Sequence, residues 1–73
     1  MKLEEIIEDI KTMQPGDDTK YYPVGNFYVD RFVCNYRFWS KGGEMHYSAK
    51  AESLKPYIRK AIKNVQKIKI FEQ

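Results

Sequence analysis

The sequence predicts an α+β fold in which a three-stranded antiparallel meander is covered on one face by two helices, in the order α-β-β-β-α. Two observations lead to this prediction. Apolar residues with helical spacing occur near both ends of the chain, and the stretch between them is rich in β-branched and aromatic residues. The 73 residues are enough for a single small domain, residues 1–73, with a modest core.

An amphipathic helix is expected over residues 2–14. Its apolar residues recur at intervals of three and four, which places them on one side of a helix, with acidic residues opposite. The acidic residues of its first turns also favour the positive end of the helix dipole. Pro15 and Gly16 end the helix, because proline cannot donate a backbone hydrogen bond and glycine tolerates a positive φ. The apolar side is formed by Leu3, Ile6, Ile7, Ile10 and Met13.

Residues 19–40 have the composition of strands. A short strand over 19–22 is followed by turn residues 23–26, and then by a run over 27–40 that is much longer than the usual strand. We therefore expect a bend or bulge in this run near Asp30 and Arg31. Alternation predicts that Phe32, Cys34, Tyr36 and Phe38 face the helices, and that Arg31, Val33, Asn35, Arg37 and Trp39 face away.

The third strand follows Gly42 and Gly43, which are typical of a hairpin turn. A two-residue loop would pair Phe38 with Tyr47 and Trp39 with His46, whereas a shift of one residue would change the partners. With that loop the inward residues are Met45, Tyr47 and Ala49, and the outward residues are Glu44, His46, Ser48 and Lys50.

The second helix is expected to start at residues 53–55, with Ser53 as its N-cap and Pro56 in its first turn. The tail 68–71 either extends this helix or forms a short final strand, and its alternation slightly favours a strand or an extended segment. The apolar side of the helix is formed by Leu54, Tyr57, Ile58, Ala61, Ile62 and Val65.

Charge is distributed unevenly along the chain. Residues 1–18 carry two Lys and six Asp or Glu, a net charge of −4, and the rest carry eleven Lys or Arg and four Asp or Glu, a net charge of +7. This asymmetry indicates either a bipolar surface or an acidic partner for the basic part.

The residues argue against catalysis. The single Cys34 and single His46 are predicted on opposite faces of the sheet, so they cannot form a nucleophile and base pair. They cannot supply the ligands of a zinc site either, and Gly42-Gly43 lacks the spacing of a phosphate loop. We expect no enzyme activity, no cofactor and no metal, and a buried Cys34 thiol. The lone cysteine, the acidic first helix and the lack of any long apolar stretch predict a cytoplasmic protein without a membrane segment.

Two surfaces are candidates for binding. One is the basic side of the second helix, which could follow a phosphate backbone, remain solvated, or lie beside the acidic first helix. Its residues are Lys55, Arg59, Lys60, Lys63 and Lys67. The other is the uncovered sheet face, where Arg31, Arg37, Trp39 and His46 could stack on bases, act as a protein contact, or pack on a second copy in a homodimer.

The predicted element order resembles that of double-stranded-RNA-binding domains. The segments equivalent to their Lys-rich cluster and their Gly-Pro-His-like loop are Ser53-Leu54-Lys55-Pro56 and Val24-Gly25-Asn26, so the resemblance covers topology and not motifs. The strand, hairpin and helix over 31–66 are also similar in order to arm-type DNA-binding domains of integrases. The leading hypothesis is a non-enzymatic protein that contacts nucleic acid. The alternative is a protein-binding inhibitor or adaptor of the phage-type, anti-defence kind, acting on an acidic protein or a nucleoprotein complex.

Overall fold

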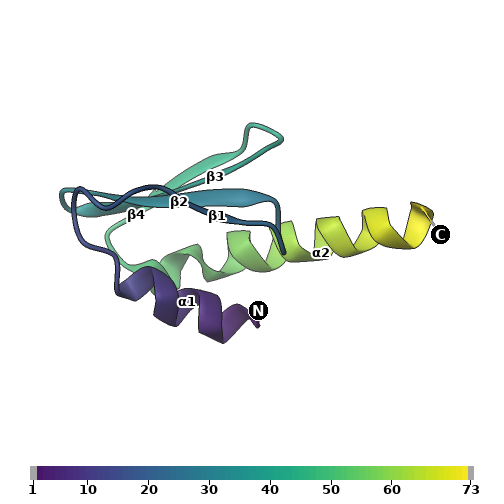
Figure 1. The fold of residues 1–73 in the computed structure, drawn as a ribbon, viewed down its shortest axis with the longest axis horizontal. Coiled ribbons are helices and arrows are strands. Elements are labelled where there is room, and N and C mark those ends of the chain that lie inside the picture. Colours follow the sequence, from purple (N-terminus) through teal and green to yellow (C-terminus); the bar gives the residue numbers. More distant parts are fainter. Residues whose placement is uncertain (1, 73) are drawn as a thin grey trace.

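A computed structural model describes the backbone of residues 2–72 and the side chains of residues 2–66. Its strands form one antiparallel sheet in the order β1-β2-β3-β4, and helices α1 and α2 lie on the same face of that sheet (Figure 1). The predicted α+β architecture is confirmed, with four strands in place of three. The elements are α1 (Leu3–Lys11), β1 (Lys20–Tyr22), β2 (Phe27–Phe32), β3 (Asn35–Ser40), β4 (Met45–Ser48), the 3₁₀-helix η1 (Ala51–Leu54) and α2 (Lys55–Glu72).

The run 27–40 is a hairpin and not one bent strand. Phe32 pairs with Asn35, so Val33 and Cys34 form a two-residue turn between β2 and β3. Val33 has a φ of 47°, a conformation that β-branched residues rarely adopt. The turn reverses the chain, so the odd-numbered residues of β2 and the even-numbered residues of β3 face the helices. Phe32, predicted to be in the core, is therefore 59% exposed.

The turn between β3 and β4 also differs from the expectation. The backbone N–H of Ser40 donates to the carbonyl of Glu44 over 2.8 Å, which leaves a three-residue loop, and Gly43 takes a φ of 94°. This extra residue shifts the register, so Phe38 pairs with His46 and Trp39 pairs with Met45. Every side chain of β4 consequently points to the face opposite to the predicted one.

The core lies between the sheet and the two helices. Phe27, Val29 and Phe38 are fully buried on the sheet, and Tyr22 and Tyr36 are nearly so. The helical layer contributes side chains that follow the predicted periodicity, except that Leu3, Tyr57, Ile62 and Val65 are only partly buried. Its buried members are Ile6, Ile7, Ile10 and Met13 from α1 and its end, and Ala51, Leu54, Ile58 and Ala61 from η1 and α2.

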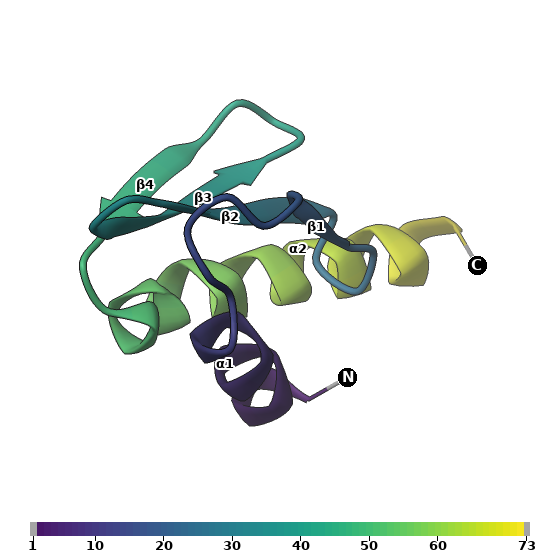
Figure 2. The same ribbon diagram turned by 60° about the vertical axis from the view of Figure 1, so that its left-hand side comes forward.

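Helix α1 is shorter than predicted, and helix α2 is longer. α1 ends at Lys11, and α2 is preceded by η1, so Ser53 lies in the 3₁₀ turn and does not cap α2. Of the two alternatives for the tail, the structure shows the extension of the helix: α2 continues to Glu72, and the slightly favoured final strand is absent from residues 2–72. The last turns of α2 extend past the end of the sheet in both views (Figures 1 and 2). Across residues 2–72, no helix combines the length and apolar character that a membrane span requires.

Hydrogen bonds and ion pairs join α1 to the rest of the fold. Asp9 accepts from the Tyr22 hydroxyl over 2.6 Å and from Lys20 Nζ over 3.0 Å, which ties α1 to β1. Lys11 Nζ lies 2.7 Å from Glu52 Oε1 of η1. Figure 2 shows that α1 crosses beneath the sheet beside α2, so the helical layer is built from segments far apart in sequence.

Candidate functional site

The sheet face away from the helices, here called the open face, carries a continuous row of large side chains. Tyr21 pairs with Tyr28, Tyr28 with Trp39, and Trp39 with Met45, so each of the four strands contributes one member. The rings of Tyr28 and Trp39 are stacked with centroids 5.6 Å apart, and those of Tyr21 and Tyr28 are 4.9 Å apart. The prediction that Trp39 projects away from the helices is confirmed.

A second row on the open face contains Asp30, Arg37 and Tyr47. The Arg37 guanidinium donates through Nε and Nη2 to both carboxylate oxygens of Asp30, over 2.7 and 2.5 Å. This carboxylate raises the pKa of Arg37. Arg37 Cζ is also 5.0 Å from the centroid of the Phe32 ring, so its charge is matched and its face is covered. The guanidinium is therefore engaged within the sheet.

Arg31 and His46, expected beside Trp39, lie on the opposite side of the sheet. Arg31 donates to the Tyr36 hydroxyl, and its Cζ sits 4.5 Å from the centroid of the Tyr36 ring. His46 stacks on Tyr57 of α2 with ring centroids 3.6 Å apart. Of the four residues proposed for this face, the structure brings together only Arg37 and Trp39.

Met45, Tyr47 and Cys34 were predicted in the core and are exposed. Met45 and Tyr47 are 51% and 61% exposed on the open face, and the Tyr47 hydroxyl donates to Met45 Sδ over 2.8 Å. Cys34 is an exposed free cysteine at the β2–β3 turn. The open face is therefore more apolar than the sequence predicts.

The basic side of α2 forms the second surface, and acidic residues already contact part of it. Lys55 Nζ lies 3.4 Å from Glu4 Oε1, and Lys60 Nζ lies 3.7 Å from Glu44 Oε1. The pKa of Glu4 is lowered, first by its own backbone hydrogen bond and then by Lys55. The pKa of Glu44 is lowered, first by His46, whose Nε2 lies 3.3 Å from Glu44 Oε1, and also by the charge of Lys60. Such exposed ion pairs are weak and open easily.

Arg59 and Lys63 form the centre of this surface. Within residues 2–66 neither forms an ion pair with an acidic side chain. Lys2 lines the same groove as Arg59 and Lys63, between α1 and α2. Leu3 and Ile62 form its apolar lining, and Glu4 also lines it. Sequence periodicity within α2 could not predict Lys2, because it comes from the other helix.

A second groove lies on the other side of Arg59 and Lys63. Lys60 and Asn64 also line it. We call Lys2, Arg59, Lys60 and Lys63 together the cationic surface. All four side chains are exposed. Lys67 continues the helical spacing, but its side chain lies outside the described residues.

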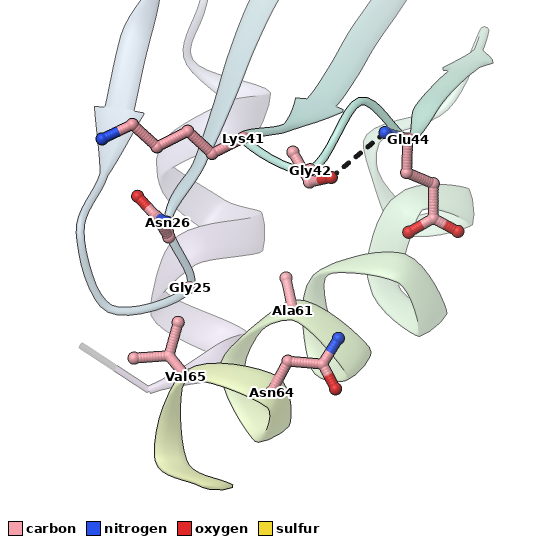
Figure 3. Close-up of a pocket in the computed structure, with 9 residues that line it drawn as sticks. Gly25, Asn26, Lys41, Gly42, Glu44, Ala61, Asn64 and Val65 are labelled. Carbon is pink, nitrogen blue, oxygen red and sulfur yellow. Dashed lines mark hydrogen bonds between the residues drawn. The ribbon is translucent and has the colours of Figure 1, made fainter. Parts of the chain in front are cut away.

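A small hollow lies between α2 and two turns of the sheet (Figure 3). Gly25 and Asn26 of the β1–β2 turn and the Lys41–Glu44 turn face Ala61 and Asn64 of α2, around a volume of about 240 Å³. Its only titratable lining groups are Lys41 and Glu44, and Glu44 donates its backbone N–H to Ser40 Oγ over 3.2 Å. These groups do not form a nucleophile and base arrangement.

In the part of the chain that the structure describes, no three His, Cys, Asp or Glu side chains are grouped so that they could hold a metal ion. Comparisons with protein-family models, with curated proteins and with solved structures found no match.

Proposed function

We propose that this protein is a non-catalytic nucleic-acid-binding protein that contacts a phosphate backbone through the cationic surface. The observation that supports this most is the arrangement of Arg59 and Lys63. They line both grooves, are joined by Lys2 on one side and Lys60 on the other, and form no ion pair with an acidic side chain among residues 2–66, although Glu4 also lines the first groove. Clustered cations of this kind supply the sequence-independent part of nucleic-acid affinity.

Neutral donors support the same proposal. Gln66 lines the first groove and Asn64 lines the second, next to the cations. Amide side chains donate hydrogen bonds to phosphate oxygens in many protein–DNA interfaces.

The open face does not support phosphate contact to the same degree. Its half-buried cation, Arg37, is already bound to both oxygens of Asp30, and Arg31 lies on the other side of the sheet. A phosphate at Arg37 would have to displace a carboxylate that is 7% exposed and would be left without its partner. We therefore assign phosphate contact to α2.

A salt series tests the proposal. Four phosphate contacts predict a slope of about −3.6 in log affinity against log salt for duplex DNA, so that affinity falls about 150-fold between 50 and 200 mM salt. Fluorescence anisotropy with labelled duplex DNA, duplex RNA and single strands measures this slope. The Arg59→Glu/Lys63→Glu variant should bind at least 10-fold more weakly at 50 mM salt, with a shallower slope.

The matched control is Lys41→Glu/Lys50→Glu, which changes the net charge equally at two exposed positions outside the cationic surface. This variant should keep the slope of the unmodified protein. The absence of binding at about 50 mM salt, or equal losses in the two double variants, would refute the proposal.

One observation favours a second candidate, an inhibitor or adaptor that binds an acidic protein. Leu3 and Ile62 give the first groove an apolar floor between its cations, which a phosphate backbone does not need and an acidic, partly apolar peptide would use. Affinity capture from a nuclease-treated lysate distinguishes the two functions. Capture of a protein by the unmodified chain, lost in Arg59→Glu/Lys63→Glu, together with no nucleic-acid binding, would favour this second candidate.

A further inference from the structure

We infer that the open face is the interface of a homodimer in which two copies pack sheet against sheet. This inference goes beyond the proposed function and does not depend on it, because the open face and the cationic surface lie on different sides of the molecule.

The exposed apolar side chains are concentrated on the open face. Tyr21, Phe32, Met45 and Tyr47 are 45%, 59%, 51% and 61% exposed, and all four belong to the open face. Val33, 63% exposed, lies at the turn where this face ends. Soluble monomers rarely leave so many large apolar groups together on one side, and a face of this kind marks an interface.

The area of the open face is sufficient for a dimer interface. A large aromatic side chain buries about 150–250 Å² when it is fully covered, so these four residues offer on the order of 400 Å². Tyr28, Trp39 and the Val33 turn raise the face to on the order of 600 Å². Specific interfaces bury about 600–1,000 Å² per partner, so a sheet-to-sheet dimer of this chain reaches the lower end of that range.

The charges on the open face are matched within one copy. Asp30 and Arg37, the ionised pair of the open face, neutralise each other through two hydrogen bonds. A strongly charged partner would find no unmatched charge there, whereas a second copy presents an equally neutral, aromatic surface. Sheet-to-sheet packing also places the two cationic surfaces on the outer sides of the dimer, so their repulsion is small.

The core of a single copy is small. Chains of about this length usually need a disulfide, a metal or oligomerisation to reinforce a single small core. Cys34 is free, and residues 2–66 contain no cluster suited to a metal. A second copy would add a sheet-to-sheet layer with the usual spacing of about 10 Å and bury the row that contains Trp39.

Sedimentation equilibrium and the fluorescence of the single tryptophan test the inference without any nucleic acid present. The unmodified protein should sediment as a dimer of 8.7 kDa chains at about 100 µM. On dilution it should dissociate, with a red shift of the Trp39 emission as water reaches the ring. Met45→Glu/Tyr47→Glu replaces two exposed side chains by charges and should be a folded monomer by circular dichroism, with Trp39 emission independent of concentration.

Arg59→Glu/Lys63→Glu serves as the control, because it changes two charges on the helical side and should remain dimeric even if it loses nucleic-acid binding. A monomer at 100 µM would overturn the inference, and so would a dimer that survives Met45→Glu/Tyr47→Glu. A monomer whose Trp39 emission is quenched by a single-stranded oligonucleotide would overturn it and would assign the open face to nucleic acid instead.

Discussion

The imidazole of His46 and the ring of Tyr57 stack face to face, with planes 9° apart. This contact joins β4, an edge strand, to the first turn of α2, and His46 also lies against Phe38. It turns the lone histidine of the chain into a packing residue on the helical side of the sheet. The His46 ring, predicted to contact a binding partner, is thus covered by a residue of α2.

A double-mutant cycle measures this stack. His46→Ala and Tyr57→Ala should each lower the free energy of unfolding, and the two changes should couple by about 0.5–1.5 kcal/mol, because aromatic pairs contribute beyond the area that they bury. Urea denaturation gives the four values. Tyr47→Ala with Tyr57→Ala is the control pair, on opposite faces of the sheet, and should couple by less than about 0.5 kcal/mol. A similar coupling in both cycles would argue against a specific stack.

Gly25 is expected to be intolerant of a side chain. A Cβ atom there would lie 2.6 Å from Cδ1 of the fully buried Phe27 ring and 3.3 Å from Cγ1 of Ile62. Gly25→Ala should therefore lower the free energy of unfolding by about 1–3 kcal/mol through overpacking. Gly42→Ala is the matched control in the other turn, since its nearest neighbour would be Ser40 Oγ at 3.8 Å, and its effect should stay within about 0.5 kcal/mol. Equal stabilities of the two variants would contradict the predicted clash.

The contacts of Asp9 predict how stability depends on pH in acid. The hydrogen bond from the Tyr22 hydroxyl lowers the pKa of Asp9, and Lys20 lowers it further. Because the folded-state pKa lies below that of the unfolded chain, the stabilisation is complete above the unfolded value of about 3.9 and is lost as pH falls through the folded value. The urea midpoint should therefore decrease as pH is lowered from about 4 towards 2.

Asp9→Asn should flatten this acid dependence and lower the free energy of unfolding at pH 7 by roughly 0.5–1 kcal/mol, a modest effect because the side chain of Asp9 is 34% exposed. Asp18→Asn, on the exposed turn after α1, changes the net charge by the same amount. The difference between the two variants isolates the contacts with Tyr22 and Lys20, and identical acid profiles would contradict their role.

Much of the architecture is predictable from local patterns. The i, i+3, i+4 spacing identifies the buried sides of both helices, and alternation in β3 correctly separates Phe38 from Trp39. The exposure of Arg37 and Trp39 on the side away from the helices follows from the same alternation. These features depend on single elements, where periodicity alone decides which side is buried.

The errors arise at turns. Val33 and Cys34 are not typical turn residues, and valine rarely takes a φ of 47°, so the sequence predicts one long strand where the structure has a hairpin. The length of the run 27–40, fourteen residues, is the feature of the sequence that indicates an interruption, because strands are usually much shorter. At the next turn, two adjacent glycines fit both a two-residue and a three-residue loop, and the choice sets the side of His46, Met45 and Tyr47.

The candidate site was less predictable than the fold because it combines distant segments. Lys2 joins Arg59 and Lys63 only when α1 packs beside α2, and the Asp30 partner of Arg37 comes from the neighbouring strand. Neither pairing has a local sequence signal. The pattern within one helix could therefore identify cations but not which of them are matched by acids.

The layer that covers the sheet comes from the two ends of the chain, and this has a consequence for folding. Phe27, Val29 and Phe38 stay accessible to water until α2 packs on them, so a paired sheet without α2 exposes apolar side chains on both of its faces. The chain must close long loops before these contacts form, and this slows them. A partly folded chain at that stage is most exposed to self-association and to capture by chaperones.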